Sequence, residues 1–314
     1  MSIEEKSYAA NPGVNSGRLL ILVTAVLWSL AGVFIKSLEL HPLTIVFYRS
    51  LFASLFFVLW IKRKSWTINL PLLVSVLSYT VAISLFVSAN KLTSAANAIV
   101  LQYTAPIFVF VFARVLFHEA ISKLNLMALL VGTLGVGIIF AGSAGQPDLG
   151  GVEVAILSGL FFSIYMTNLR FLKEVEPGYL TLANNTVCCV ALLPWVGSQL
   201  ELSAGEIALL SVMGAIQLGV PYYLFSKGLE RISLQEASLI VLVEPVLNPV
   251  WVALAFGEIP SRATLIGGGI ILLGLGCRYL WPLLSRSTSV SGANRQGASP
   301  VGQEASQADR TQRP

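Results

Sequence analysis

The sequence has 314 residues, of which 55% are hydrophobic and only 11% are charged. This composition excludes a soluble globular protein, because too little polar side chain is present to cover its surface, and it indicates a chain that lies in lipid. The net charge of +4 alone would suggest a nucleic acid as partner, but the positions of the Lys and Arg residues do not support one. They lie mostly in one set of loops, so we expect a lipid bilayer as partner and no nucleic acid.

Ten apolar runs of membrane length follow residues 1–17, a polar segment that we expect to be disordered. Runs of about 20 residues suit a hydrocarbon core of roughly 30 Å, and their continuous hydrophobicity excludes a β-barrel. The fold class we predict is an all-α membrane protein with ten transmembrane helices. We place them at Leu19–Leu38, Pro42–Ile61, Leu70–Ala89, Ala96–Phe117, Leu124–Gly142, Val152–Leu172, Gly178–Val196, Ile207–Lys227, Glu236–Phe256 and Ala263–Leu283. Residues 285–314 are rich in Ser, Gly, Gln and Arg, and we expect a disordered tail.

The distribution of Lys and Arg predicts the orientation of these spans. With a cytoplasmic N-terminus, the outside loops contain only Lys36, Lys91 and Arg262 as cations, and the inside segments hold most of the others. Cytoplasmic loops of membrane proteins carry this excess of positive charge. We therefore expect an integral protein of the plasma (inner) membrane with both termini in the cytoplasm.

Two stretches, Ser94–Ser122 and Ser233–Ser261, align with each other without a gap. The alignment continues into the following helix, so the repeat unit is about half of the protein: residues 18–142 and 151–284. Five spans is an odd number, so the second half enters the membrane from the opposite side, as in inverted repeats that work by alternating access. The aligned pairs include Pro106 with Pro245, Phe117 with Phe256, Glu119 with Glu258 and Gly135 with Gly274.

This pattern resembles the EamA-type, ten-helix branch of the drug/metabolite transporter superfamily, over nearly the whole chain. The residues that carry the resemblance are Ala98, Pro106 and Glu119 in the first half and Glu236, Ala237, Glu244, Pro245 and Glu258 in the second. The resemblance implies a secondary transporter that exports or exchanges small metabolites such as amino acids. Relatives that carry nucleosides, sugars or nucleotide-sugars leave those solutes open as alternatives. No cofactor is expected.

Two charged residues lie inside predicted spans and are the leading candidates for substrate binding. Arg49 is about seven residues into the second span and Glu244 about eight into the ninth, each roughly 10 to 12 Å from its membrane surface. A charge at this depth costs about 2.5 to 3.5 kcal/mol and normally faces a cavity or a partner. The forked donors of Arg49 suit a carboxylate or phosphate. The competing interpretation is a structural role, by snorkelling or pairing.

Prolines predict helix breaks near these two residues. Each proline removes a backbone hydrogen bond and frees the carbonyl four residues earlier, which makes backbone available to a ligand. The predicted breaks are at Pro106, Pro221, Pro245 and Pro249. Simple kinks for helix packing are the alternative.

Further polar and aromatic residues complete the predicted site. Asn248 and Trp251 share a helix face with Glu244, at the fourth and seventh positions after it. The other candidates for substrate binding are Gln102, Gln217, Trp28, Tyr79 and Tyr103. For each aromatic residue a packing role competes with ligand contact.

A mechanism follows from the two charges. In the empty carrier we expect Glu244 to neutralise Arg49, directly or through Asn248 and water, because an unpaired buried charge is costly. A solute carboxylate would displace Glu244. The released Glu244 would then bind a solute ammonium or take up a proton.

Other functions fit the sequence less well. Two aspartates, Asp148 and Asp309, supply no acidic cluster for a transferase, and two peripheral histidines supply neither a protease base nor a metal site. Cys188, Cys189 and Cys277 have no metal-ligand spacing. A solute channel remains the alternative of a different class. The Gly-rich helices suit close packing, and a homodimer through them is a further expectation.

The topology is tested by labelling single cysteines in a cysteine-free background. We expect position 64, in the loop that holds Lys62, Arg63 and Lys64, to be protected from an impermeant reagent added to intact cells. The loop around Gln146 should react. Labelling of position 64 from outside would overturn the orientation.

Overall fold

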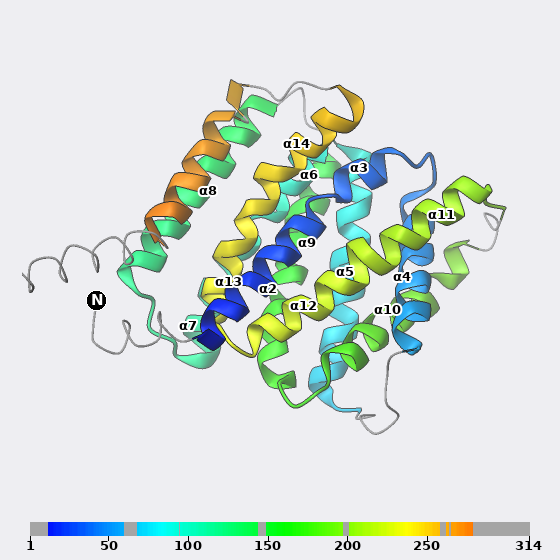
Figure 1. Cartoon of the computed structure of the whole chain (residues 1–314), viewed down its shortest axis with the longest axis horizontal. Coiled ribbons are helices and arrows are strands. Elements are labelled where there is room, and N and C mark those ends of the chain that lie inside the picture. Colours follow the sequence, from blue (N-terminus) through cyan, green and yellow to red (C-terminus); the bar gives the residue numbers. More distant parts are fainter. Residues whose placement is uncertain are drawn as a thin grey trace, which may run out of the picture. The chain divides into compact units, whose positions relative to one another are not determined.

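The computed structural model describes residues 12–59, 68–93, 95–143, 149–196, 201–257, 262–263 and 265–278. Throughout these ranges the regular structure is helical, with no strand (Figure 1). The described residues as far as Leu275 belong to one compact unit, and the chain from Gly276 onward is a second unit. The predicted all-α fold class is thus confirmed.

The first half of the chain contains seven labelled helices. They are α2 (Pro12–Trp28), α3 (Ala31–Lys36), α4 (Pro42–Val58), α5 (Leu70–Leu92), α6 (Ala95–Gln102), α7 (Ala105–Phe117) and α8 (Lys123–Ser143). Polar side chains fix some of the starts: Asn69 accepts a hydrogen bond from the backbone N–H of Leu72 at the start of α5.

The second half contains the remaining helices. They are α9 (Leu149–Asn168), η2 (Leu169–Leu172), α10 (Pro177–Val196), α11 (Ala204–Val212), η3 (Met213–Gly219), α12 (Val220–Leu229), α13 (Leu234–Ile240), η4 (Val241–Val243) and α14 (Glu244–Phe256), followed by an unlabelled helix, Leu265–Arg278. Segments η2 and η4 are 3₁₀-helices and η3 is a π-helix.

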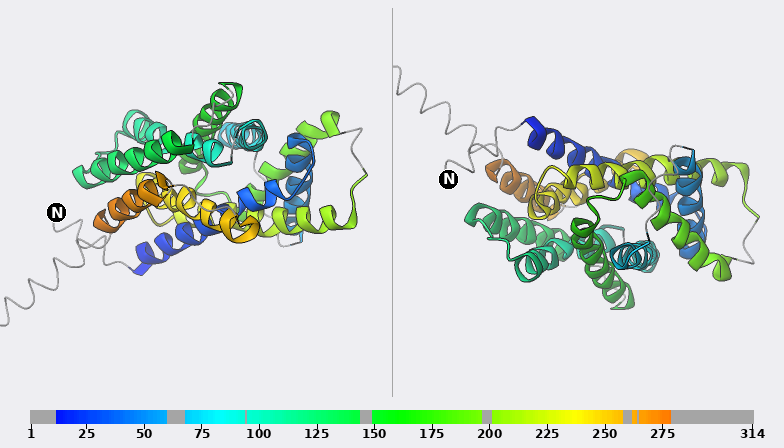
Figure 2. Two further views of the ribbon diagram at one scale, coloured as in Figure 1. Left: turned by 90° about the horizontal axis from the view of Figure 1, so that it is seen from above. Right: turned by 90° about the horizontal axis from the view of Figure 1, so that it is seen from below.

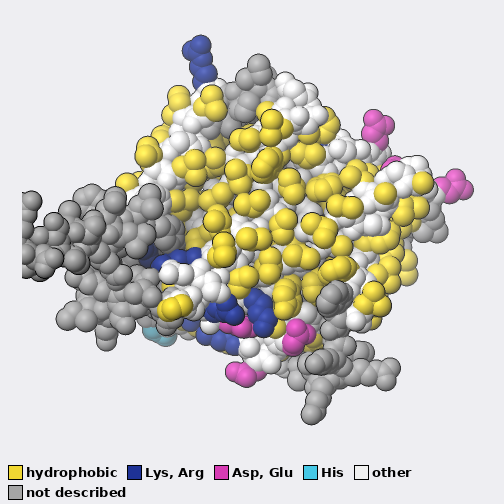
Figure 3. Space-filling view, in the orientation of Figure 1, with side chains coloured by type: hydrophobic (Ala, Val, Ile, Leu, Met, Phe, Trp, Pro, Cys, Tyr) yellow, Lys and Arg dark blue, Asp and Glu magenta, His cyan; other side chains and the backbone are white. Residues whose placement is uncertain are grey.

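Seven helical stretches of the described chain are long and apolar enough to cross a membrane. They are Pro12–Lys36, Leu70–Leu92, Lys123–Gly142, Gly150–Leu172, Pro177–Val196, Ala204–Leu229 and Leu234–Phe256. Three shorter apolar helices are Pro42–Val58, Ala105–Phe117 and Leu265–Arg278. Figure 3 shows apolar side chains over the centre of one face, with charged side chains at its edges. The chain is therefore an integral membrane protein.

Several of these stretches are broken in the middle. The helix turns at Ser29 and Leu30 between α2 and α3, and again at Tyr103 and Thr104 between α6 and α7. In the second half, η3 separates α11 from α12, and η4 separates α13 from α14. Broken helices at membrane depth are typical of transporters, where the freed backbone lines a cavity or meets protein donors.

The ends of α7 and α14 repeat the same geometry. His118 follows α7 with φ of 52°, and Gly257 follows α14 with φ of 71°, so both are left-handed C-caps. Their backbone N–H groups donate to the carbonyls of Ala113 and Ala253. Glycine adopts this conformation without strain, whereas histidine pays a steric cost there. The turn is therefore kept in the first half even though its glycine is not.

Helix pairs bring distant parts of the sequence side by side. α5 packs against α9, α10 against α4, and α12 against α2, as the two views of Figure 2 and Figure 1 show together. A close approach joins α8 to the last helix, where a Cβ on Gly135 would lie 2.6 Å from the carbonyl oxygen of Gly267. These glycines pack within one chain, which confirms their predicted role in close helix packing.

One boundary differs from the prediction. Residues 12–17, which we expected in a disordered segment, form the first turns of α2, because Pro12 suits a helix start and Gly17 packs closely on Arg231. Residues 1–11, the Lys62–Lys64 loop, the Gln146 loop, Glu258 and the 285–314 tail lie outside the described residues.

We expect Gly135→Ala to lower the thermal midpoint of the protein in detergent. The new Cβ would press on a backbone carbonyl of the neighbouring helix, which cannot rotate away. Gly137→Ala is the matched control, because a Cβ at Gly137 meets nothing within 4 Å and alanine favours the helix by up to about 1 kcal/mol. Equal midpoints for the two variants would show that α8 is not held at this contact.

Candidate functional site

A cavity of about 420 Å³, its open mouth included, lies where the broken helices meet. Its polar lining consists of Arg49 from α4, Gln102 from α6, Gln217 from η3 and Glu244 from α14. Its remaining lining is apolar or aromatic: Trp28, Ala31, Ala82, Ile83, Phe86, Phe162, Leu218 and Tyr222. An apolar cavity with a few convergent polar groups is the usual form of a small-molecule site.

Arg49 is held in the cavity wall by close backbone packing. Gly214 of η3 lies directly against the backbone of Arg49, and a Cβ on Gly214 would also come within 2.7 Å of the Phe52 Cβ. The Arg49 side chain is only 1% exposed. Within the described part of the chain, its Nε and Nη2 atoms have no hydrogen-bond partner. A buried guanidinium with two free donors is a binding group for an anion.

Glu244 is buried at the first turn of α14, and its carboxylate contacts Tyr103 of the opposite half. Tyr103 Oη lies 2.5 Å from Glu244 Oε2 and 2.8 Å from the carbonyl oxygen of Val241. That carbonyl lacks its helical partner because residue 245 is proline; it also accepts the backbone N–H of Glu244. The freed carbonyl expected near Val241 is therefore present, and a side chain of the other half binds it.

The expected direct pairing of Arg49 with Glu244 is wrong for this structure. No ion pair joins the two side chains, both of which lie in the described ranges. Tyr103 contacts the Glu244 carboxyl group instead, and the Asn248 amide, our alternative bridge, donates elsewhere. Arg49 and Glu244 thus line one cavity without an ion pair between them.

Asn248 and Trp251 contact the break in the first helix. Asn248 Nδ2 donates to the carbonyl of Ser29 at 2.8 Å, and Trp251 Nε1 donates to the Ser29 hydroxyl at 2.7 Å. Gln217 Nε2 reaches the neighbouring carbonyl of Trp28 at 3.4 Å. Two residues of the polar face predicted as a ligand stripe, Asn248 and Trp251, therefore bind Ser29 at the break after α2. Sequence reasoning missed this break, since no proline marks it; the signal is Gly32, against which Asn248 packs.

Three of the four predicted proline breaks are present. Pro106, Pro221 and Pro245 are each the second residue of a helix that follows an interruption: α7, α12 and α14. Pro249 is different, because α14 continues through it to Phe256. A proline this near the helix start lacks only one bond to the first turn, so it need not end the helix.

Two of the aromatic candidates, Trp28 and Tyr79, belong to one cluster of rings around Tyr222 of the cavity wall. The Trp28 ring lies 4.8 Å from that of Tyr222 and 5.5 Å from that of Phe162, and the Tyr79 ring lies 4.9 Å from that of Tyr222. The Tyr79 hydroxyl donates to Asn185 at 2.9 Å, on the side of α10. Phe162, Phe86 and Ala82 were not predicted, because apolar residues of a membrane helix give no sequence signal for the cavity they line.

At one end of the bundle, which we call the basic side, charged contacts tie the two halves together. Glu119 at the end of α7 binds Arg170 of η2 at 2.8 Å and accepts from Gln235 of α13 at 3.3 Å. Arg18 of α2 binds Glu236 of α13 at 2.8 Å. Glu119 thus pairs with a cation. These contacts form a latch between the halves, which we define as Glu119–Arg170, Glu119–Gln235 and Arg18–Glu236.

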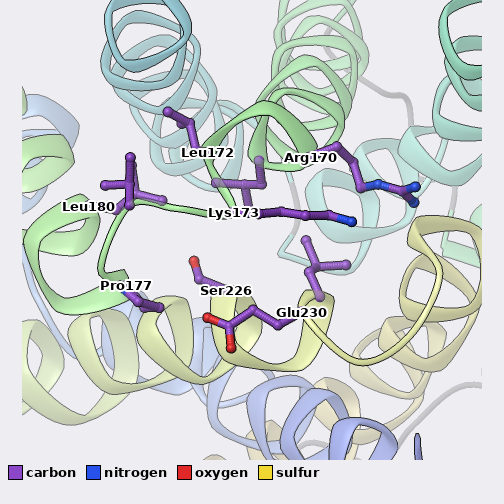
Figure 4. Close-up of a pocket in the computed structure, with 10 residues that line it drawn as sticks. Arg170, Leu172, Lys173, Pro177, Leu180, Ser226 and Glu230 are labelled. Atoms are coloured by element: carbon purple, nitrogen blue, oxygen red, sulfur yellow. The ribbon is translucent and has the colours of Figure 1, made fainter. Parts of the chain in front are cut away.

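A second pocket, of about 320 Å³, opens beside this latch. Figure 4 shows Lys173 above Ser226 and Glu230, which lie at the end of α12, while Arg170 points away from them. The direction of Arg170 agrees with its ion pair to Glu119 and its contact with the Phe117 ring, 5.2 Å from the centroid. This pocket is therefore a recess of the basic side, separate from the cavity of Arg49 and Glu244.

An all-helical membrane chain with breaks at mid-depth and a buried polar cavity has the features of a secondary transporter. The model of the EamA-like transporter family matches residues 15–141 and 149–278, one match in each half, so this chain belongs to the EamA-like transporter family. The resemblance expected from the sequence is confirmed, and the protein is a transporter of this family.

Individual relatives agree with this assignment. An uncharacterized transporter of Archaeoglobus fulgidus is 27% identical over 82% of this chain and 94% of its own length. The uncharacterized transporter YxxF of Bacillus subtilis is 23% identical over 81% of this chain and 86% of its own length. A solved crystal structure has a TM-score of 0.73 and 17% identity over 85% of this chain and 98% of its own, which shows a common fold.

We expect Glu119→Gln to loosen the latch. Spin labels at positions 123 and 173 flank the Glu119–Arg170 pair and should show a longer and broader distance distribution in this variant, because glutamine cannot form the ion pair. Glu174→Gln, which removes an exposed glutamate near the same pair, is the control. Unchanged distances in Glu119→Gln would show that the pair does not hold the halves together.

Proposed function

We propose that this transporter carries small zwitterionic solutes, amino acids foremost, across the plasma membrane by alternating access. The chain would cross the membrane ten times as two inverted five-helix repeats, with both termini and the basic side in the cytoplasm. The observation that carries the proposal is the cavity in which Arg49 has two free donors and Glu244 shares the wall. Export or exchange is the expected mode.

The chemistry of the two groups supports this class of solute. Arg49 would bind a carboxylate with its forked donors, and Glu244 would bind an ammonium group. A phosphate would also suit Arg49, but an acidic side chain in the same cavity favours a solute that also carries a positive charge. The aromatic cluster of Trp28, Phe162 and Tyr222 would take the apolar part of the solute.

Alternating access is favoured over a channel by the contacts between the halves. On the basic side the latch joins the two halves by charged contacts, whereas the cavity lies between the broken helices. A carrier needs such a contact set that breaks when the other side closes. A channel would need a continuous polar path instead.

We expect Arg49→Lys to lower counterflow of a labelled amino-acid mixture in liposomes at least about tenfold, the factor that corresponds to 1.4 kcal/mol of lost interaction. Lysine keeps the charge but has no planar fork. Arg114→Lys, at an exposed position of α7, is the matched control and should transport normally.

Nucleosides and sugars are run as separate arms of this assay. Counterflow of either in place of amino acids would replace the proposed solute class. Normal amino-acid counterflow by Arg49→Ala at wild-type expression would remove Arg49 from the binding site.

A further inference from the structure

We infer that Glu244, Tyr103 and the Val241 carbonyl form a proton-binding site, and that a solute ammonium and a proton compete for Glu244. This inference rests on the proposed function, and it names the coupling ion and the residue that links it to the conformation. It begins with three oxygen atoms in a row: Glu244 Oε2, Tyr103 Oη and Val241 O, separated by 2.5 and 2.8 Å.

The number of protons decides what this row can be. A phenol carries one proton, and a carbonyl oxygen only accepts. If Glu244 is ionised, the single proton of Tyr103 can form a hydrogen bond either to Glu244 Oε2 or to Val241 O. The remaining contact then brings two oxygen atoms together with no proton between them. If Glu244 is a carboxylic acid, it donates to Tyr103 and Tyr103 donates to Val241. Both distances then are ordinary O–H···O hydrogen bonds.

The surroundings of Glu244 agree with the acid form. The side chain is 6% exposed, and the described structure gives it Tyr103 as its partner and no cation. The other titratable groups that line the cavity with it are Arg49 and Tyr222. Arg18 of α2 and Lys36 of α3, two elements that pack on α14, contact Glu236 and the Phe256 ring instead. An ionised carboxylate at this depth would need stronger partners.

The site depends on how the two repeats stand relative to each other. Tyr103 lies in the break between α6 and α7 of the first repeat, whereas Val241 and Glu244 lie in the break between α13 and α14 of the second. A movement of one repeat against the other separates the three oxygens. Protonation of Glu244 therefore stabilises the conformation described, and loss of the proton frees the halves to move.

Binding of a solute ammonium group releases the proton from Glu244. When an ammonium group approaches Glu244, the carboxylic acid gives its proton to water at the mouth of the cavity, and the resulting carboxylate pairs with the ammonium. One proton is released for each zwitterion bound. Since both ligands use the same carboxyl group, the carrier moves them in turn, which is proton–solute antiport.

Infrared spectroscopy of the full-length protein in liposomes tests the site without any solute. We expect a carboxylic-acid C=O band at neutral pH that is absent in Glu244→Gln. In Tyr103→Phe the midpoint for loss of this band should move to lower pH, because the acid loses its hydrogen-bond acceptor. Tyr165→Phe is the matched control, because that buried hydroxyl accepts a hydrogen bond from Asn184 and its loss should leave the midpoint in place.

A trapped pH dye tests the exchange. Addition of an amino-acid mixture should release protons in wild type and Tyr165→Phe, and not in Glu244→Gln. If the acid band is absent from wild type, or its midpoint is unchanged or higher in Tyr103→Phe, the proton site is wrong even where counterflow persists. If the band behaves as expected but no solute shows counterflow, the proposed function fails and the proton site stands. Counterflow without proton release would show that the solute and the proton do not compete for Glu244.

Discussion

Each break in a membrane helix frees backbone carbonyls, and in lipid a carbonyl without a donor costs several kcal/mol. The arrangement of this protein depends on how these groups are satisfied. At the break before α14, Tyr103 donates to Val241; at the break after α2, Asn248 and Gln217 donate to Ser29 and Trp28. Every one of these donors comes from the opposite half of the chain. The breaks therefore join the two repeats at the depth where the cavity lies.

The same contacts explain why the cavity is asymmetric although the sequence is duplicated. Glu244 follows the second-half break, whereas the aligned position in the first half is Ala105. Arg49 is fixed by the close approach of Gly214 and faces the cavity with free donors. Under the proposed function, one cationic and one acidic group therefore bind a solute from two different repeats. A relative movement of the repeats changes the distance between them, which is how binding and access become coupled in such a carrier.

Sequence reasoning reached the helices, the repeat and most polar residues of the cavity, because hydrophobic length, proline and intramembrane charge each leave a local signal. Arg49, Glu244, Gln102 and Gln217 came together as expected. The partners of these residues could not be predicted. Glu244 contacts Tyr103 rather than Arg49, and Asn248 contacts Ser29, because such choices depend on side-chain directions across helices far apart in sequence. The predicted break at Pro249 is absent for a similar reason: whether a proline ends a helix depends on its distance from the helix start, which the sequence does not define.

The central claim is that the Arg49–Glu244 cavity is reached from one side of the membrane at a time. A single cysteine at position 217, in a background without Cys188, Cys189 and Cys277, reports this directly when an impermeant thiol reagent is added to either side. The account predicts that the two reactivities are inversely related, so that solute or pH conditions that raise one lower the other. Reaction at the same rate from both sides, rising and falling together, would indicate a continuous pore and contradict it.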